Sequence, residues 1–146
     1  MTSPRTNPIL QAALVDLIDL SLVAKQAHWN VRGANFRSVH LELDEIIDQV
    51  RVNSDDVAER LAAVGGSPDG RAATVAATSQ VPTIEPGPIE AGAVVADFSQ
   101  RISQAARRIE TSLPELDEDM PSQDLLTGIV GELDKAAWML RSQVAA

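Results

Sequence analysis

The chain has 146 residues, of which 45% are hydrophobic and only 3% aromatic. It contains no cysteine, which excludes disulfides, zinc-thiolate sites and a cysteine nucleophile, so we expect a cytoplasmic protein. The 21 acidic and 12 basic side chains give a formal charge of -9, which disfavours nucleic acid and favours cations as partners. We expect one domain over residues 1–146, with neither a signal peptide nor a membrane-spanning segment.

The first predicted helix runs from Asn7 to Val31. Its apolar residues recur at spacings of three and four, which is typical of a helix with one buried stripe. We expect Gly33 to end this helix in a left-handed conformation and Asn35 to cap the next one. The predicted stripe comprises Leu10, Leu14, Leu17, Ile18 and Leu22.

The second predicted helix begins at Phe36 and meets neither Pro nor Gly before Gly65, which makes it roughly 45 Å long. The connection that follows, from Gly65 to Pro88, is rich in Gly and Pro. Inside it, the Ala-rich segment from Arg71 to Ser79 predicts a short helix. The stripe of the second helix is Phe36, Val39, Leu43, Ile47, Val50, Val57, Leu61 and Val64.

Two further helices follow the long connection. The third is predicted from Ile89 to Leu113, with Arg101, Arg107 and Arg108 on its outer face. The fourth begins at Ser122 as the capping residue. Its stripe is Leu125, Ile129, Leu133, Ala136, Leu140 and Val144. No strand pattern competes, so the fold class is all-α, a four-helix bundle with a long crossover between its second and third helices, the ferritin-like arrangement.

Two pairs of metal-ligating side chains lie on the second helix. His40 and Asp44 are four residues apart, as are Asp55 and Glu59, so each pair projects from one helical face. Eleven residues from Asp44 to Asp55 return to within about 20° of the same direction, so both pairs share that face. The other histidine, His28, lies across the turn from His40. These nitrogen and oxygen donors suit iron and related divalent ions.

One chain cannot bring both pairs to one ion, because about 16 Å of helix separates Asp44 from Asp55. A second copy resolves the separation. If two second helices cross antiparallel about a two-fold axis near Gln49 and Val50, residues 40 and 44 of one copy face residues 55 and 59 of the other. Two identical sites result, each with two imidazoles and three carboxylates.

Four segments resemble the Dps family of ferritin-like mini-cages. They are KQAHWNVRG at 25–33, DDVAERLAAVGG at 55–66, SPDG at 67–70 and DLLTGIVGELDKAAWMLR at 124–141. The resemblance implies a homo-dodecamer that oxidises Fe(II), with hydrogen peroxide favoured over dioxygen, and stores ferric mineral, thereby protecting the cell against oxidative damage. Iron is the implied metal, with no organic cofactor. The implied inter-subunit ferroxidase ligands are His28, His40, Asp44, Asp55 and Glu59.

The resemblance assigns roles to further acidic residues. Asp119 and Asp124 match acids that line a three-fold pore in the family, and a hydrophilic loop is the alternative interpretation. Glu45 and Asp48 lie on an adjacent face of the second helix and are candidates for mineral nucleation or for ordinary surface. Asp56 is rotated by about 120° from Asp44 and is expected to form a local ion pair.

The two tryptophans also have two interpretations. Trp29, beside His28, resembles a family tryptophan that lies close to the site and intercepts oxidising equivalents, in the manner of an electron relay. The simpler interpretation makes Trp29 and Trp138 large packing residues. The expected partner of Asp56 is Arg60, one helical turn further along.

Many members of the family hold DNA with a tail rich in Lys or Arg. Here Arg5 is the one basic residue before the first helix, and Ser-Gln-Val-Ala-Ala follows Arg141. We therefore expect no direct DNA binding. Two alternatives remain open. The same di-metal site could perform hydrolysis with a metal-bound water as nucleophile, or the assembly could be a structural DNA-compacting protein.

Overall fold

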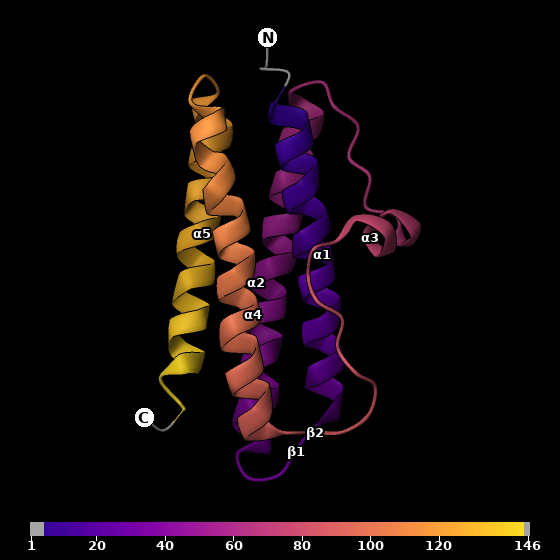
Figure 1. Cartoon of the computed structure of the whole chain (residues 1–146), viewed down its shortest axis with the longest axis vertical. Helices are drawn as coiled ribbons and strands as arrows, with labels where there is room; N and C mark the ends of the chain where they lie inside the picture. The colour runs from indigo at the N-terminus through magenta and orange to yellow at the C-terminus, as the bar shows by residue number, and fades with distance from the viewer. Residues whose placement is uncertain (1–4, 145–146) are drawn as a thin grey trace.

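Four long helices lie side by side along the longest axis of the molecule (Figure 1). They are α1 (Thr6–Asn30), α2 (Phe36–Ala63), α4 (Ala91–Ser112) and α5 (Met120–Arg141). The computed structural model describes residues 5–144. The prediction that neither end carries a basic tail concerns residues that lie partly outside this range. The all-α bundle expected from the apolar periodicity is confirmed, and its helix bounds agree closely with the predicted ones.

The crossover between α2 and α4 runs along the bundle beside α1 (Figure 1). It contains the predicted short helix, α3 (Ala72–Thr78). It ends in β2 (Ile89–Glu90), which pairs in parallel with β1 (Val31–Arg32), directly after α1. Two residues are too few for an alternating pattern, so this pairing could not be predicted from the sequence. The short helix η1 (Leu113–Leu116) joins α4 to α5.

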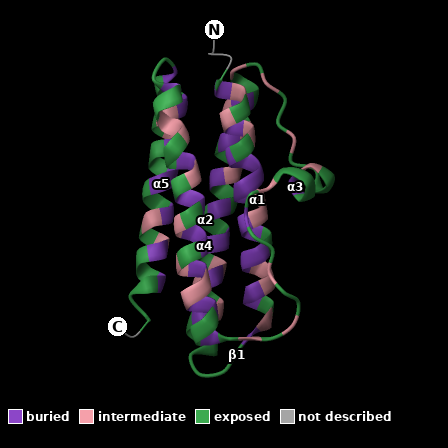
Figure 2. Cartoon of the chain, in the orientation of Figure 1, coloured by how far each residue is buried: buried purple, intermediate pink, exposed green. Residues whose placement is uncertain are grey.

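The core lies between the four long helices, each of which buries one face (Figure 2). α1 packs mainly on α2, and α4 packs mainly on α5. Three members of the predicted stripes are exceptions, because Leu22 is 53%, Phe36 43% and Val144 46% exposed. Their placement in the core was wrong. The apolar period continues onto surfaces that this chain alone does not cover.

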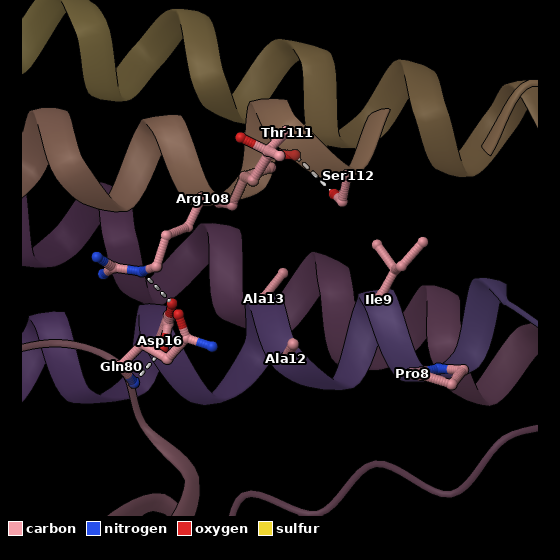
Figure 3. A pocket seen from close by; sticks show the side chains of 10 residues that line it. Pro8, Ile9, Ala12, Ala13, Asp16, Gln80, Arg108, Thr111 and Ser112 are labelled. Atoms are coloured by element: carbon pink, nitrogen blue, oxygen red, sulfur yellow. Dashed lines mark hydrogen bonds and ion pairs between the residues drawn. The ribbon is translucent and has the colours of Figure 1, made fainter. Parts of the chain in front are cut away.

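Two arginines of α4 hold the crossover against the bundle. Buried Asp16 accepts hydrogen bonds from Arg108 Nε at 2.8 Å and from the backbone N–H of Gln80 at 2.9 Å (Figure 3). Arg101, predicted on the outer face, is buried and donates to the carbonyl of Pro82. That prediction was wrong because the crossover covers this part of α4 and supplies an acceptor for the guanidinium.

The helix ends follow the predictions only in part. Gly33 has a φ of +96°, the left-handed conformation expected there. Asn35 stands at the N-cap of α2, but its side chain makes no capping hydrogen bond. The cap of α5 is Asp119 instead of Ser122, since the Asp119 carboxylate accepts from the Ser122 N–H at 3.3 Å. Both residues are capping types, and the sequence alone does not choose between them.

α1 is long and apolar enough to meet the length and composition of a membrane span. Its most apolar window has a mean hydropathy of 1.4, and 56% of that window is buried inside the bundle. Core helices of water-soluble bundles meet the same criteria, so this is weak evidence for a span.

Candidate metal centre

The two histidines form the core of the candidate site at the end of the bundle where α1 turns into α2. His28 is buried at the end of α1, and His40 is half-buried in the second turn of α2. Their rings are stacked, with centroids 3.7 Å apart and planes inclined by 13°. The pair therefore acts as one unit that the turn between the helices holds together.

Reciprocal hydrogen bonds orient both rings. His28 Nδ1 lies 2.7 Å from the carbonyl oxygen of His40, and His40 Nδ1 lies 2.7 Å from that of His28. A carbonyl oxygen only accepts, so each Nδ1 must carry the hydrogen and donate it. In a neutral ring the lone pair then resides on Nε2. This is the arrangement that prepares a histidine to bind a metal, with a backbone carbonyl fixing the tautomer.

Asp44 is the third predicted ligand and lies beside His28. Its Oδ1 is 3.7 Å from His28 Nε2 and accepts a hydrogen bond of 2.7 Å from Lys25 Nζ. This hydrogen bond lowers the pKa of Asp44. The carboxylate is 42% exposed, so it is accessible from solvent while a cation of the protein neutralises it.

Asp55 and Glu59 lie on the exposed surface of α2, beyond its midpoint. The structure does not bring them to the histidines, consistent with the separation of about 16 Å expected along a helix. Among residues 5–144, no three His, Asp or Glu side chains are grouped closely enough to hold a metal ion. One chain thus supplies two parts of a ligand set and no complete site.

Two aromatic side chains border the histidines. Phe36 stacks on His40, with centroids 5.0 Å apart and planes inclined by 29°. Trp29 is 67% exposed, and its ring lies 6.0 Å from Lys25 Nζ. Trp138 is 54% exposed, so neither tryptophan is a core residue of the single chain. Packing within the single chain therefore does not explain either residue.

Asp119 does not present a free carboxylate to solvent. It is 6% exposed, and it accepts from Arg60 Nη2 at 2.9 Å and from Ser122 Oγ at 2.7 Å. Burial raises the pKa of Asp119, but the hydrogen bonds from Ser122 and the charge of Arg60 outweigh it, so the pKa is lowered. This corrects two predictions. Asp119 is a structural cap instead of a pore-lining acid, and Arg60 pairs with it instead of with Asp56.

The remaining predicted acids differ in their surroundings. Asp124 is exposed in the first turns of α5. Glu45 lines a groove of about 320 Å³ between α2 and α5. In that groove, the Gln49 amide donates to Glu132 of α5. Asp48 does not line this groove, so the structure separates the two residues that the sequence grouped as nucleation candidates.

The cavity drawn in Figure 3, of about 390 Å³, lies between α1, α4 and the crossover. Its lining comes from the beginning of α1 and the end of α4, including Pro8, Ala12 and Ser112. That position is far along α1 from His28, and none of the five predicted ligands contributes to it. A hydrolase that used these ligands would need a substrate-sized pocket next to them, and this cavity lies elsewhere.

Comparison with known proteins shows the family to which the chain belongs. A family model described as a ferritin-like domain matches residues 8–146. The DNA protection during starvation protein of Agrobacterium fabrum is 32% identical over 93% of this chain and 85% of its own length. The chain is a member of the Dps family. The crystal structure of Mycobacterium smegmatis Dps superimposes with a TM-score of 0.91 at 32% identity, covering 97% of this chain and 86% of the other.

Some members of the family are considerably longer. Two DNA protection during starvation proteins of Deinococcus radiodurans are 34% and 36% identical over 91% of this chain. The chain spans 56% and 65% of their lengths. What these longer proteins do as wholes is therefore a separate question from what this Dps domain does.

Two residues at the site were not predicted from the sequence to belong to it. Lys25 belongs to the KQAHWNVRG segment, but it was given no role, although it lies one helical turn before His28 on the same side of α1. Phe36 was assigned to the core, although it lies four residues before His40, a spacing that brings two rings together on a helix. Helical spacing could have pointed to the contact between Phe36 and His40, whereas the contact between Lys25 and Asp44 depends on how α1 packs on α2.

Proposed function

We propose that this Dps-family protein is a ferroxidase that oxidises Fe(II) and stores the ferric product. The observation that carries the proposal is the reciprocal pair of hydrogen bonds between His28 and His40, which leaves an Nε2 lone pair on each ring, that of His28 lying 3.7 Å from Asp44 Oδ1. Imidazole and carboxylate donors together suit Fe(II), which is the substrate here. The stacked rings and their hydrogen bonds hold both imidazoles in place before any ion arrives.

The reaction requires two electrons for each peroxide. Two Fe(II) ions each give one electron to hydrogen peroxide, which takes up two protons and becomes two water molecules. In this scheme, His28 and His40 hold and orient the ions, while the carboxylates of Asp44, Asp55 and Glu59 balance the growing positive charge. Hydrogen peroxide is the proposed oxidant, and its consumption protects the cell against oxidative damage. Exposed Trp29 is a candidate electron relay.

The complete centre is proposed to form between two chains. The separation along α2 means that Asp55 and Glu59 come from a partner related by a two-fold axis. Twelve chains would form a closed cage around the mineral. The groove that contains Glu45, Glu42 and Glu132 is the proposed nucleating surface on the inner wall. Asp124 is the remaining candidate for a cation-attracting pore.

The protein is proposed to act in the cytoplasm without binding DNA directly. The formal charge of -9 on each chain opposes association with a polyphosphate backbone. No structural observation favours hydrolysis, the other interpretation of the ligand set. A redox-silent ion such as Zn²⁺ is accordingly expected to support no turnover.

The deciding experiment combines Fe(II) oxidation with measurement of the assembly. Purified protein is given anaerobic Fe(II) followed by peroxide, and ferric product is recorded by its near-ultraviolet absorbance, while light scattering gives the mass of the particle. We expect peroxide to accelerate oxidation well beyond the protein-free rate in a closed oligomer. A monomer, or oxidation no faster than in buffer, contradicts the proposal.

A further inference from the structure

Two oppositely charged side chains at the middle of α2 have no partner among residues 5–144. Asp48 and Arg51 are both exposed, and in the part of the chain that the structure describes neither side chain makes a hydrogen bond or an ion pair. They lie three residues apart, where they could have paired with each other on the helix surface. Their separation in the single chain leaves both charges available to something else.

These two residues share the symmetry of the ligand pairs. The midpoint between Asp48 and Arg51 falls between residues 49 and 50. The midpoint between His40 and Glu59 falls at the same place, and so does the midpoint between Asp44 and Asp55. An antiparallel crossing at that point therefore brings Asp48 of each copy opposite Arg51 of the other, in the same register that joins the two parts of the metal centre.

The two charges also lie on the face of the ligands, so the assignment of Asp48 to the same adjacent face as Glu45 was wrong. At about 100° per residue, Asp48 is rotated by about 40° from Asp44, and Arg51 by about 20° in the opposite sense. Glu45 is rotated by about 100°, toward the groove with α5. One side of α2 therefore carries the ligands and this charge pair, and an adjacent side carries the acidic groove.

Exposed apolar residues border this face. Val52, next to Arg51, is 56% exposed, and Leu22 and Trp29 of α1 are 53% and 67% exposed at a spacing of two helical turns. Large exposed apolar side chains on neighbouring helices are typical of a surface that a partner covers. The partner must also present charges complementary to Asp48 and Arg51.

We propose that the partner is a second copy of this chain and that two reciprocal Asp48–Arg51 ion pairs across the two-fold axis set its register. The inference rests on the proposed shared metal centre and assigns to Asp48 a role different from mineral nucleation. The ion pairs lie at the axis itself, so a slip of the helices along each other breaks both of them. They select the one register in which the histidines of each copy meet Asp55 and Glu59 of the other.

Charge reversal tests the register directly. Asp48→Lys places a lysine opposite Arg51 twice in each pair of chains, and Arg51→Glu places a glutamate opposite Asp48 twice. Each variant alone is expected to associate at least about tenfold more weakly than wild type, with greater weakening at low salt. In a mixture of the two variants, every two-fold pair that contains one chain of each variant regains both ion pairs. Recovery of the oligomer on mixing, recorded by light scattering and native mass, is the expected result.

Controls separate this proposal from the proposed function. Asp56→Lys makes the same charge change at an exposed position of α2 that lies off this face, and it should assemble like wild type. Circular dichroism checks that each variant keeps its helices, and Asp48→Asn with Arg51→Gln tests loss of attraction without repulsion. If the reversed variants assemble like wild type, or if mixing restores nothing, the ion pairs are refuted even where Fe(II) oxidation is intact. If mixing succeeds but wild type does not oxidise Fe(II), the ion pairs stand and the ferroxidase proposal fails.

Discussion

Lys25 Nζ lies 2.7 Å from Asp44 Oδ1, on the same carboxylate oxygen that is 3.7 Å from His28 Nε2. The lysine thus neutralises a proposed iron ligand from within the chain. A divalent ion at this position must displace the ammonium group or share the carboxylate with it. Lys25 is 25% exposed and sits on a flexible stem, so it can withdraw from Asp44 when an ion binds.

Lys25→Gln should therefore strengthen the binding of a divalent ion. Removing the competing cation is expected to tighten Co(II) binding by about three- to tenfold in a calorimetric titration, since Co(II) reports affinity without oxidation. The pKa of Asp44 should also rise toward its ordinary value, which moves the acid limit of binding to higher pH. Lys25→Arg keeps the positive charge and serves as the control. Unchanged or weaker binding by the glutamine variant would show that Lys25 does not compete with the ion.

His40→Ala and Glu59→Ala should each reduce Fe(II) oxidation by at least about tenfold while assembly persists, because each removes a ligand and leaves the buried stripe of α2 intact. Initial rates of ferric absorbance and the particle mass are measured on the same samples. Asp56→Ala removes an exposed carboxylate from the same helix and should retain the wild-type rate. Loss of the oligomer in parallel with activity would instead make these residues structural.

The sequence predicted the bundle well because α1, α2, α4 and α5 are long and amphipathic. It failed where a residue's surroundings come from distant segments or from other chains. Leu22 continues the apolar period of α1 but is exposed, since periodicity does not tell a core from an interface. Arg101 is buried because the crossover supplies the carbonyl of Pro82. The five ligands could be named from spacing and resemblance, whereas the Lys25–Asp44 contact depends on how α1 packs on α2.

Asp119→Asn should destabilise the fold by about 1 kcal/mol, since it weakens the cap of α5 and the ion pair with Arg60. The sign of the pH dependence follows from the lowered pKa. The ionised carboxylate of Asp119 stabilises the fold at pH values above the pKa of an Asp in the unfolded chain, about 3.9. This contribution is lost as the pH falls through the lower pKa of Asp119 in the folded chain. Urea denaturation of wild type and Asp119→Asn at neutral and acidic pH should show that their difference in unfolding free energy becomes smaller in acid. A pH-independent difference would contradict an ionised cap.

Asp124→Asn should affect iron entry and not stability, because the Asp124 carboxylate is exposed and caps no helix. Stability should be unchanged. Iron entry should slow at low Fe(II) and low salt, and less at high salt, because ions screen attraction into a negative channel. Stopped-flow rates at two salt concentrations provide the measurement. Identical rates of iron entry in wild type and Asp124→Asn would show that Asp124 is an ordinary exposed acid with no role in a pore.

A gel-shift experiment at low salt tests the absence of direct DNA binding. The net charge of -9 on each chain is expected to prevent any shift of linear duplex DNA at micromolar protein. Addition of Mg²⁺ is an informative second condition, since a divalent ion can bridge two acidic surfaces. A shift without divalent ions, abolished by moderate salt, would demonstrate a phosphate-binding surface and reverse this prediction.

Co-assembly of two inactive variants tests whether the metal centre is shared between chains. One variant has His28, His40 and Asp44 replaced by Ala, and the other has Asp55 and Glu59 replaced by Ala. Each is inactive alone, because every site lacks one part of its ligands. In randomly mixed pairs, a site is complete only when its histidines come from the second variant and its distal carboxylates from the first.

Each part of a site is drawn independently with even odds, so about a quarter of the sites should be complete. Peroxide-driven oxidation is therefore expected to return to roughly a quarter of the wild-type rate, with mixing verified by native mass. A site built within one chain predicts no rescue at all, since each chain lacks one part of it. The separation of about 16 Å along α2 favours the first outcome. Inactive particles that contain both variants would overturn the antiparallel pairing of α2 near Gln49.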